Sequence, residues 1–112
     1  MNKLAKEIFE ANKAVGWWTD DVESRNKPEL IALMHSELSE ALEALRKDLN
    51  DDHLPHRKGV EVELADTVIR ILDFCGAFDL DIEGAINEKL AYNAQRADHK
   101  LKNREKSGGK KF

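Results

Sequence analysis

One segment of the sequence, residues 59–79, constrains the fold more than any other. It reads GVEVELADTVIRILDFCGAFD, an apolar run with an acidic pair, Glu63 and Asp66, near its centre. On a helix with about 100° per residue, apolar side chains cover one face and both flanks of this segment. They are Val60, Leu64, Val68, Ile71, Leu72 and Cys75 on the face, and Val62, Ile69 and Phe74 on the flanks. We therefore predict a helix that is buried on most sides.

The two carboxylates of this segment are three residues apart, so they project from the same side of the helix, close to Arg70. Because unpaired charge is costly in a packed environment, the pair needs a cation. A second acidic pair, Glu37 and Glu40, has the same spacing within HSELSEALEALR, residues 35–46.

This second pair shares its sector of a helix with Leu33 and two small residues, Ala41 and Ala44, which would let another helix approach closely. The main apolar stripe of the same helix consists of Leu38, Leu42, Leu45 and Leu49. Two helices that each offer carboxylates at i and i+3 can bring four carboxylates to one point. Oxygen-only ligands suit Mg²⁺ or Mn²⁺, and the sequence therefore predicts a metal site.

Composition indicates one small helical domain. The chain has 112 residues, 41% of them hydrophobic and 36% charged, with only six Gly and two Pro, so we expect helices and no strands. The single cysteine, Cys75, lies on the apolar face and is expected to be a reduced core residue. No apolar run has the length of a membrane span, and the first ten residues lack the apolar block of a signal peptide, so we expect a cytoplasmic protein.

Four helices are predicted from periodicity and capping residues. They span residues 2–15, 27–49, 59–79 and 82–97, with Gly16, Pro28 and Asp81 at suitable ends. Between the second and third helices, the loop HLPH has two histidines without further ligands nearby, which is typical of surface residues rather than of a zinc site.

Two further groups of residues are candidates for ligand contact. Trp17 and Trp18 are adjacent in the first connection, where one could anchor the core and the other could stack on a base; core packing is the favoured interpretation. Lys89, Asn93 and Arg96 continue the line of apolar residues on the fourth helix, so we expect them to point inward as donors to phosphate oxygens. The alternative is that they only neutralise the carboxylates.

Charge divides the chain into a helical domain, residues 1–98, and a basic, flexible tail, residues 99–112. The tail has six Lys or Arg against one acidic residue, whereas the rest of the chain carries a net charge of −9. An acidic body with a basic tail favours a polyanionic ligand, and the alternative is a solvated, partly disordered tail.

The ordered motifs resemble a known family. Glu37-x-x-Glu40, 22 intervening residues and Glu63-x-x-Asp66 are similar to the ExxE and ExxD motifs of the MazG-like family of all-α nucleoside triphosphate pyrophosphohydrolases. Further similarities are GWW at residues 16–18, ELADTVIRILD at 63–73 and EKLAYNAQRADHK at 88–100. An ExxE motif alone means little in a chain with 22 acidic residues, but the ordered set covers most of the chain and is specific.

The resemblance implies Mg²⁺-dependent cleavage of a (d)NTP to the (d)NMP and pyrophosphate, often as house-cleaning of the nucleotide pool. The implied roles are metal binding by Glu37, Glu40, Glu63 and Asp66, phosphate binding by Lys89, Asn93 and Arg96, and base contact by Trp17 and Trp18. The resemblance also implies a four-helix bundle whose active site is completed by oligomerisation, as a homodimer or a tetramer of two dimers. No stable nucleic-acid partner is expected.

The chain departs from the family pattern at two places. Ser36 stands where the family motif often begins with a first glutamate, which can remove an auxiliary metal ligand. The chain ends in Gly108-Gly109-Lys110-Lys111 and Phe112 after a charged segment, where many relatives have a short Arg-Pro and His-Gly-Lys-Lys sequence.

The chemistry follows from the predicted ligands. Carboxylate-bound cations would neutralise charge on the triphosphate and lower the pKa of a bound water. Glu40 and Glu37 are the expected catalytic residues, with Glu40 as the candidate for both ligand and base.

Two other classes of protein fit part of the pattern. A di-iron carboxylate bundle is disfavoured because it needs a Glu-x-x-His pair on each of two helices. Here the residues at the position of the histidine, three after each glutamate, are Glu40 and Asp66. A non-enzymatic helical interaction module with a basic, nucleic-acid-touching tail explains the tail, but it leaves Glu63 and Asp66 on an apolar helix without a reason.

Overall fold

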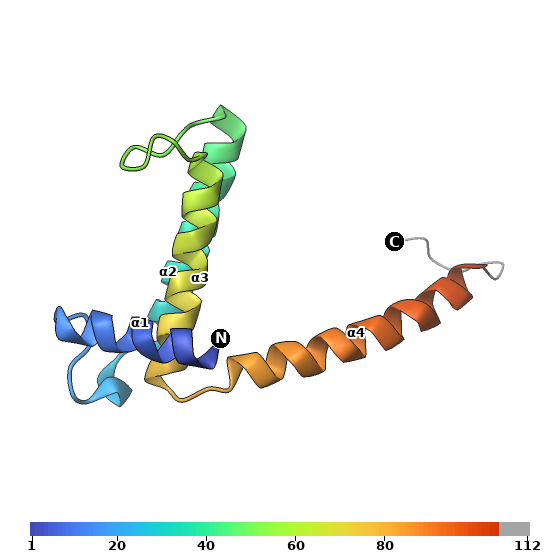
Figure 1. The fold of residues 1–112 in the computed structure, drawn as a ribbon, viewed down its shortest axis with the longest axis horizontal. Helices are drawn as coiled ribbons and strands as arrows, with labels where there is room; N and C mark the ends of the chain where they lie inside the picture. Colours follow the sequence, from blue (N-terminus) through green and yellow to red (C-terminus); the bar gives the residue numbers. More distant parts are fainter. Residues whose placement is uncertain (106–112) are drawn as a thin grey trace. The chain divides into compact units, whose positions relative to one another are not determined.

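The computed structural model describes residues 1–105, and the side chains of residues 1–96 (Figure 1). Its elements are α1 (Asn2–Ala14), the 3₁₀ turn η1 (Val22–Ser24), α2 (Lys27–Lys47), α3 (Gly59–Ala77) and α4 (Ile82–Glu105). No strand is present between residues 1 and 105. The prediction of an all-helical chain is therefore confirmed.

The helix starts follow the local sequence. Asn26 caps α2 because its side-chain oxygen accepts a hydrogen bond of 3.1 Å from the backbone N–H of Glu29, and a proline stands in the first turn. Asp81 accepts a bond of 2.9 Å from the backbone N–H of Gly84 at the start of α4. Gly16, expected to end the first helix, has a φ of +90°, a conformation that favours glycine.

The first three helices end within two residues of the predicted positions, and the largest difference is in α4. We expected the fourth helix to end near Ala97, but α4 continues to Glu105, so the predicted tail begins as helix. Residues 97–105 contain no proline or glycine that would stop a helix. The rest of the predicted tail, residues 106–112, lies outside the described residues.

The chain forms two units, and the second begins at Asp81. The first unit, Met1–Leu80, contains α1, α2 and α3, and the second contains α4. The division predicted from charge, at residues 98 and 99, falls within α4 and stays a prediction, as does the four-helix bundle.

In the first unit α3 packs against both α1 and α2 (Figure 1). The core lies where these helices meet the connection after α1, and its buried residues are Phe9, Trp18, Leu30 and Ala77. The Trp18 ring contacts Phe9 and Phe78 edge to face, with both pairs of ring centroids 5.7 Å apart. This geometry is favourable for aromatic pairs.

Small residues set the distance between the helices. A Cβ atom on Gly76 of α3 would lie 2.9 Å from the Cβ atom of Phe9 and would also meet the backbone oxygen of Ala5, so α1 crosses α3 at this glycine. On the other side, a Cβ atom on Gly59 would lie 3.0 Å from the Cβ atom of Ala44 on α2. The predicted close approach at Ala41 and Ala44 is confirmed, because both are buried.

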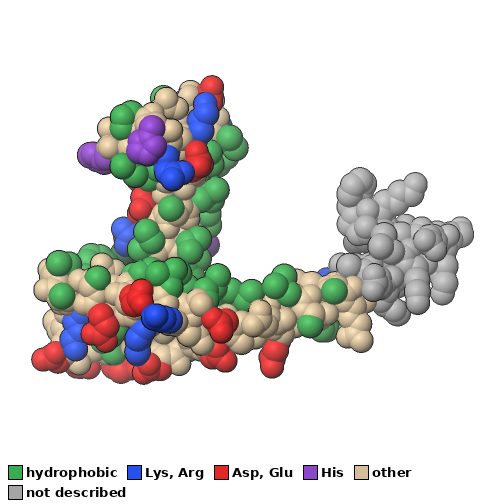
Figure 2. All heavy atoms as spheres, viewed as in Figure 1, with side chains coloured by type: hydrophobic (Ala, Val, Ile, Leu, Met, Phe, Trp, Pro, Cys, Tyr) green, Lys and Arg blue, Asp and Glu red, His purple; other side chains and the backbone are tan. Residues whose placement is uncertain are grey.

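The predicted burial of the third helix on most sides is correct only in part: Leu72 and Cys75 of α3 are buried, but other apolar side chains of the first unit are exposed. The leucine stripe, which consists of Leu38, Leu42 and Leu45 on α2 and Leu49 just after it, is between 47% and 63% exposed. On α3, Leu64, Val68 and Ile69 are also more than 40% exposed. The physical reason is that α3 uses its small residues, rather than these side chains, against α1 and α2. Figure 2 shows hydrophobic side chains on the surface of this unit.

Part of this apolar surface forms a groove between α1 and α3 with a volume of about 710 Å³. Leu4 and Ile8 line it from α1, and Leu64, Val68 and Leu72 line it from α3. Within residues 1–105, no helix combines the length and the apolar character that crossing a membrane requires.

Candidate metal centre

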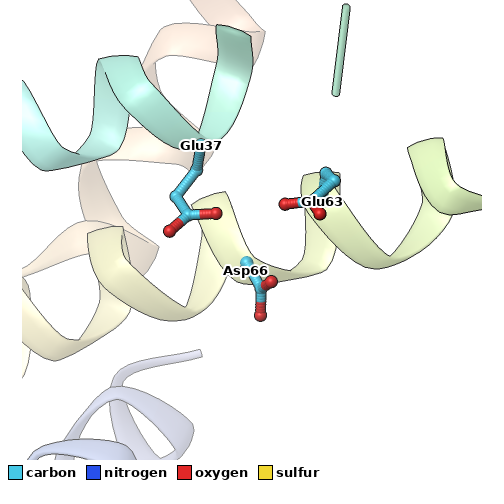
Figure 3. A group of neighbouring side chains, drawn as sticks. All are labelled: Glu37, Glu63 and Asp66. Carbon is cyan, nitrogen blue, oxygen red and sulfur yellow. The ribbon is translucent and has the colours of Figure 1, made fainter. Parts of the chain in front are cut away.

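Three of the four predicted metal ligands converge. Glu37 of α2 faces Glu63 and Asp66 of α3, and one carboxylate oxygen from each lies within 4.8 Å of the other two (Figure 3). The i and i+3 spacing places both α3 carboxylates on the side facing Glu37, and the small residues of α2 bring the two helices together.

Glu63 is the centre of this acidic cluster, which consists of Glu37, Glu63 and Asp66. Burial is the main cause that raises the pKa of Glu63 to about 7, and the negative charge of Glu40 is the next. Its Oε2 atom is buried and has no hydrogen-bond partner among residues 1–96. The neighbouring carboxylates of Glu37 and Glu40 can share a hydrogen bond with Glu63 only through a proton. Glu63 therefore requires either a proton or a cation.

Asp66, like Glu63, is a carboxyl group whose charged form is disfavoured by burial and by neighbouring negative charges. Burial raises its pKa, as do the negative charges of Glu37 and Asp51, and Arg70 partly opposes the shift. A cation bound among these oxygens would relieve the repulsion, and carboxylate oxygens are the ligands that Mg²⁺ and Mn²⁺ prefer. The residues present thus fit a divalent metal ion.

Glu40, the fourth predicted ligand, lies at the edge of the cluster. It is exposed on α2 and acts on Glu63 through its charge, but its oxygens are not part of the group within 4.8 Å. Its position suits a group that contacts solvent as well as the cluster.

Arg70 joins the acidic cluster to a cavity. Its Nε donates a hydrogen bond of 3.0 Å to Oε1 of Glu37, whose side chain is only 14% exposed. The sequence indicated Arg70 only as a neighbour of the acidic pair; its spacing of four residues after Asp66 is the signal that places it on the same side of the helix.

The cavity beside the cluster has a volume of about 400 Å³. Glu37, Asp66 and Arg70 line one part of it, and Asn12, Trp17 and Asp73 line another part, together with Val15 and Ile69. It therefore combines carboxylates, a guanidinium group and an aromatic ring within one concave site.

The two adjacent tryptophans lie in different environments, one in the core and the other at the cavity. Trp18 is 3% exposed and lies in the core, whereas Trp17 is 40% exposed at the cavity. The prediction of core packing is confirmed for Trp18. Contact with a base remains a prediction. Trp17 is the exposed candidate, and Cζ of Arg25 lies 4.7 Å from the centroid of its ring.

Asp73 is a buried site residue that our sequence analysis missed. Its two oxygens accept bonds of 2.9 and 3.0 Å from Nε1 of Trp18. Burial raises the pKa of Asp73, and hydrogen bonds from Trp18 and Asn12 oppose the shift. An acidic residue seven positions after Asp66, two turns along the same helix, was the available signal.

A second missed residue, Asp51, belongs to the loop between α2 and α3. Its Oδ2 accepts bonds of 2.9 and 2.7 Å from the backbone N–H groups of His53 and Leu54, which shapes the loop, and its charge acts on Asp66. His53 and His56 are exposed, as predicted.

The phosphate-binding candidates Lys89, Asn93 and Arg96 lie on α4, in the second unit, where all three are exposed. Lys89 Nζ lies 4.7 Å from the ring centroid of Tyr92 on the same helix. Their inward orientation toward the acidic cluster stays a prediction.

Comparison with family models, with curated proteins and with solved structures found no match to this chain. Its function must therefore be inferred from its own residues.

Proposed function

We propose that this protein is a Mg²⁺-dependent nucleoside triphosphate pyrophosphohydrolase that converts a (d)NTP to the (d)NMP and pyrophosphate in nucleotide-pool house-cleaning. The observation that carries the proposal is the convergence of Glu37, Glu63 and Asp66 beside the cavity lined by Trp17. The spacing of the two acidic motifs, with its resemblance to the MazG-like family, supplies the reaction class.

In this proposal Glu37, Glu63 and Asp66 hold Mg²⁺, or Mn²⁺ in its place, and Glu40 completes the carboxylate set. The bound metal would neutralise the triphosphate and lower the pKa of an attacking water. Glu40 is the candidate base because it is exposed next to the cluster. Glu37 both binds the metal and fixes Arg70.

The nucleoside is assigned to the cavity of about 400 Å³, a volume within the usual range for small-molecule sites. Its base stacks on Trp17, and Trp18 supports the site from the core. Lys89, Asn93 and Arg96 are assigned to the phosphates as donors from α4.

The exposed apolar stripes support the proposal of a homo-oligomer. Three leucines on α2, Leu49 just after it and three apolar residues on α3 remain more than 40% exposed in one chain. Contiguous exposed apolar surface is typical of an interface with another chain. We therefore propose a homodimer, or a tetramer of two dimers, in the cytoplasm, with no stable nucleic-acid partner.

The proposal is tested by measuring pyrophosphate release from a panel of canonical and modified nucleoside triphosphates, with Mg²⁺ and with chelator. We expect Mg²⁺-dependent release with the monophosphate as the co-product. Glu63→Gln and Asp66→Asn should each lower the turnover at least about a hundredfold, since replacing even an outer-shell partner of a metal costs about 10- to 100-fold. Unchanged turnover in these variants would contradict the metal assignment.

The alternative is a non-enzymatic helical interaction module, and the exposed leucine stripe of α2 is the observation that favours it. Such a module gives no reason for the buried oxygen of Glu63 that has no hydrogen-bond partner among the described residues. Thermal unfolding discriminates the two: the enzyme gains stability from Mg²⁺, whereas the module does not.

A further inference from the structure

Arg70 lies between the two halves of the candidate site. Its Nε donates to Glu37 in the acidic cluster, and its Cζ is 5.9 Å from the ring centroid of Trp17. The side chain lines the cavity and is 34% exposed. The guanidinium group therefore contacts both the aromatic ring and the acidic cluster.

Most hydrogen-bonding capacity of Arg70 remains available to a ligand. A guanidinium group has five N–H donors, and among the described residues only the Nε donor of Arg70 makes a hydrogen bond. Its contact with Trp17 is with the face of the ring and uses no N–H group. The terminal nitrogens can therefore donate to an anion in the cavity, and their planar arrangement suits the oxygens of a phosphate.

The contact with Glu37 fixes this orientation. Glu37 is largely buried, and the bond of 3.0 Å restrains the guanidinium on the side of the cavity that faces the cluster. A restrained guanidinium loses less conformational freedom when it binds an anion.

We propose that Arg70 binds the phosphate attached to the nucleoside, and that Glu37 positions Arg70 for this contact. The inference rests on the proposed function. With the base on Trp17 and the metal-binding oxygens beyond Arg70, the first phosphate after the sugar is the one that meets the guanidinium. The two outer phosphates are assigned to the metal. Arg70 thus recognises the part of the substrate that becomes the monophosphate product.

Binding of the two reaction products, the monophosphate and pyrophosphate, tests whether Arg70 contacts the first phosphate or has only a structural role. The nucleoside monophosphate that binds most tightly in a panel carries the base and the phosphate assigned to Arg70, whereas pyrophosphate carries only the outer two. Binding of each product is measured by calorimetry at a fixed free Mg²⁺ concentration. Arg70→Gln should weaken monophosphate binding at least about tenfold, the effect of losing one charge-assisted hydrogen bond, and should change pyrophosphate binding less than about twofold.

Arg57→Gln is the matched control. Arg57 forms an exposed pair of 3.3 Å with Glu61 at the start of α3, so this variant has the same charge change outside the cavity. It should bind both products like the wild type. If Arg70→Gln loses helicity, Arg70→Lys serves instead: it keeps the positive charge beside Glu37 but not the planar fork, and it should still weaken monophosphate binding selectively.

The results separate the inference from the proposed function. Equal losses for both products, or no loss for the monophosphate, overturn the role of Arg70 even in an enzyme that releases pyrophosphate. A wild-type protein that binds no monophosphate overturns it as well. If the wild type releases no pyrophosphate but binds a monophosphate through Arg70, the role of Arg70 is supported and the proposed hydrolase activity is contradicted.

Discussion

The carboxyl group of Glu63 has a pKa raised to about 7, mainly by burial. Its ordinary value is 4.5, so between pH 4.5 and about 7 the folded protein binds more protons than the unfolded chain. The free energy of unfolding should therefore fall as pH rises through this range and level off above it. Urea unfolding in chelator, from pH 4.5 to 8, measures this slope.

Glu63→Gln should flatten the slope, because glutamine does not titrate. Part of the slope should remain, since the pKa values of Asp66 and Asp73 are raised as well. Glu43→Gln, at an exposed position of α2, is the control and should follow the wild type. An unaltered slope in Glu63→Gln would show that Glu63 is not protonated in the folded protein.

The bond from Trp18 to Asp73 predicts a difference between the two tryptophans. Trp18→Phe leaves the buried Asp73 carboxylate without its indole donor and should lower the free energy of unfolding by about 1–3 kcal/mol. Trp17→Phe should lower it less, because the Trp17 ring is exposed and its hydrogen bond affects the pKa of Asp73 less than the bond from Trp18 does. Equal losses in urea unfolding would contradict this division between core and cavity.

At the scale of residues, spacing predicted the acidic cluster but not its surroundings. Two i and i+3 pairs could be read from the sequence, and three of those four carboxylates converge. Asp73 and Asp51 were missed because their importance depends on contacts 55 residues away for Asp73 and on the folded loop for Asp51. Adjacent tryptophans gave no signal for which ring would be buried.

At the scale of elements, the crossing of α1 over α3 depends on Gly76. Gly76→Ala would place a Cβ atom against the backbone oxygen of Ala5 and the side chain of Phe9. The backbone atom cannot move without shifting α1, so the variant should lose about 1–3 kcal/mol of stability despite the better helix propensity of alanine. Urea unfolding measures this loss. A stabilised Gly76→Ala variant would contradict the close packing of these helices.

The helix starts were predictable because their capping residues are local signals, as at Asn26 and Asp81. The end of α4 was not predictable, because a charged segment is compatible with both a solvated helix and a disordered tail. Apolar periodicity identified α2 and α3, but it could not tell which apolar side chains would face a neighbouring helix of the same chain. Small residues, which contribute little to that periodicity, determine the contacts.

At the scale of the whole molecule, the exposed leucines of α2 predict self-association. Leu42 and Leu45 are more than half exposed in one chain, so the double variant Leu42→Gln/Leu45→Gln should fold normally but lose the oligomer. Leu54→Gln, at an exposed position of the α2–α3 loop, is the control. Light scattering after size exclusion gives the masses. A wild-type monomer, or a double variant with the wild-type mass, would contradict the assignment of this surface.

Mn²⁺ binding to the protein without nucleotide shows whether Glu37, Glu63 and Asp66 form a divalent metal site. Electron paramagnetic resonance counts the free ion, so the result does not depend on the choice of substrate. We expect saturable binding that Asp66→Asn weakens at least about tenfold and that the exposed control Glu43→Gln leaves unchanged. No saturable binding, or equal binding by Asp66→Asn, would contradict it.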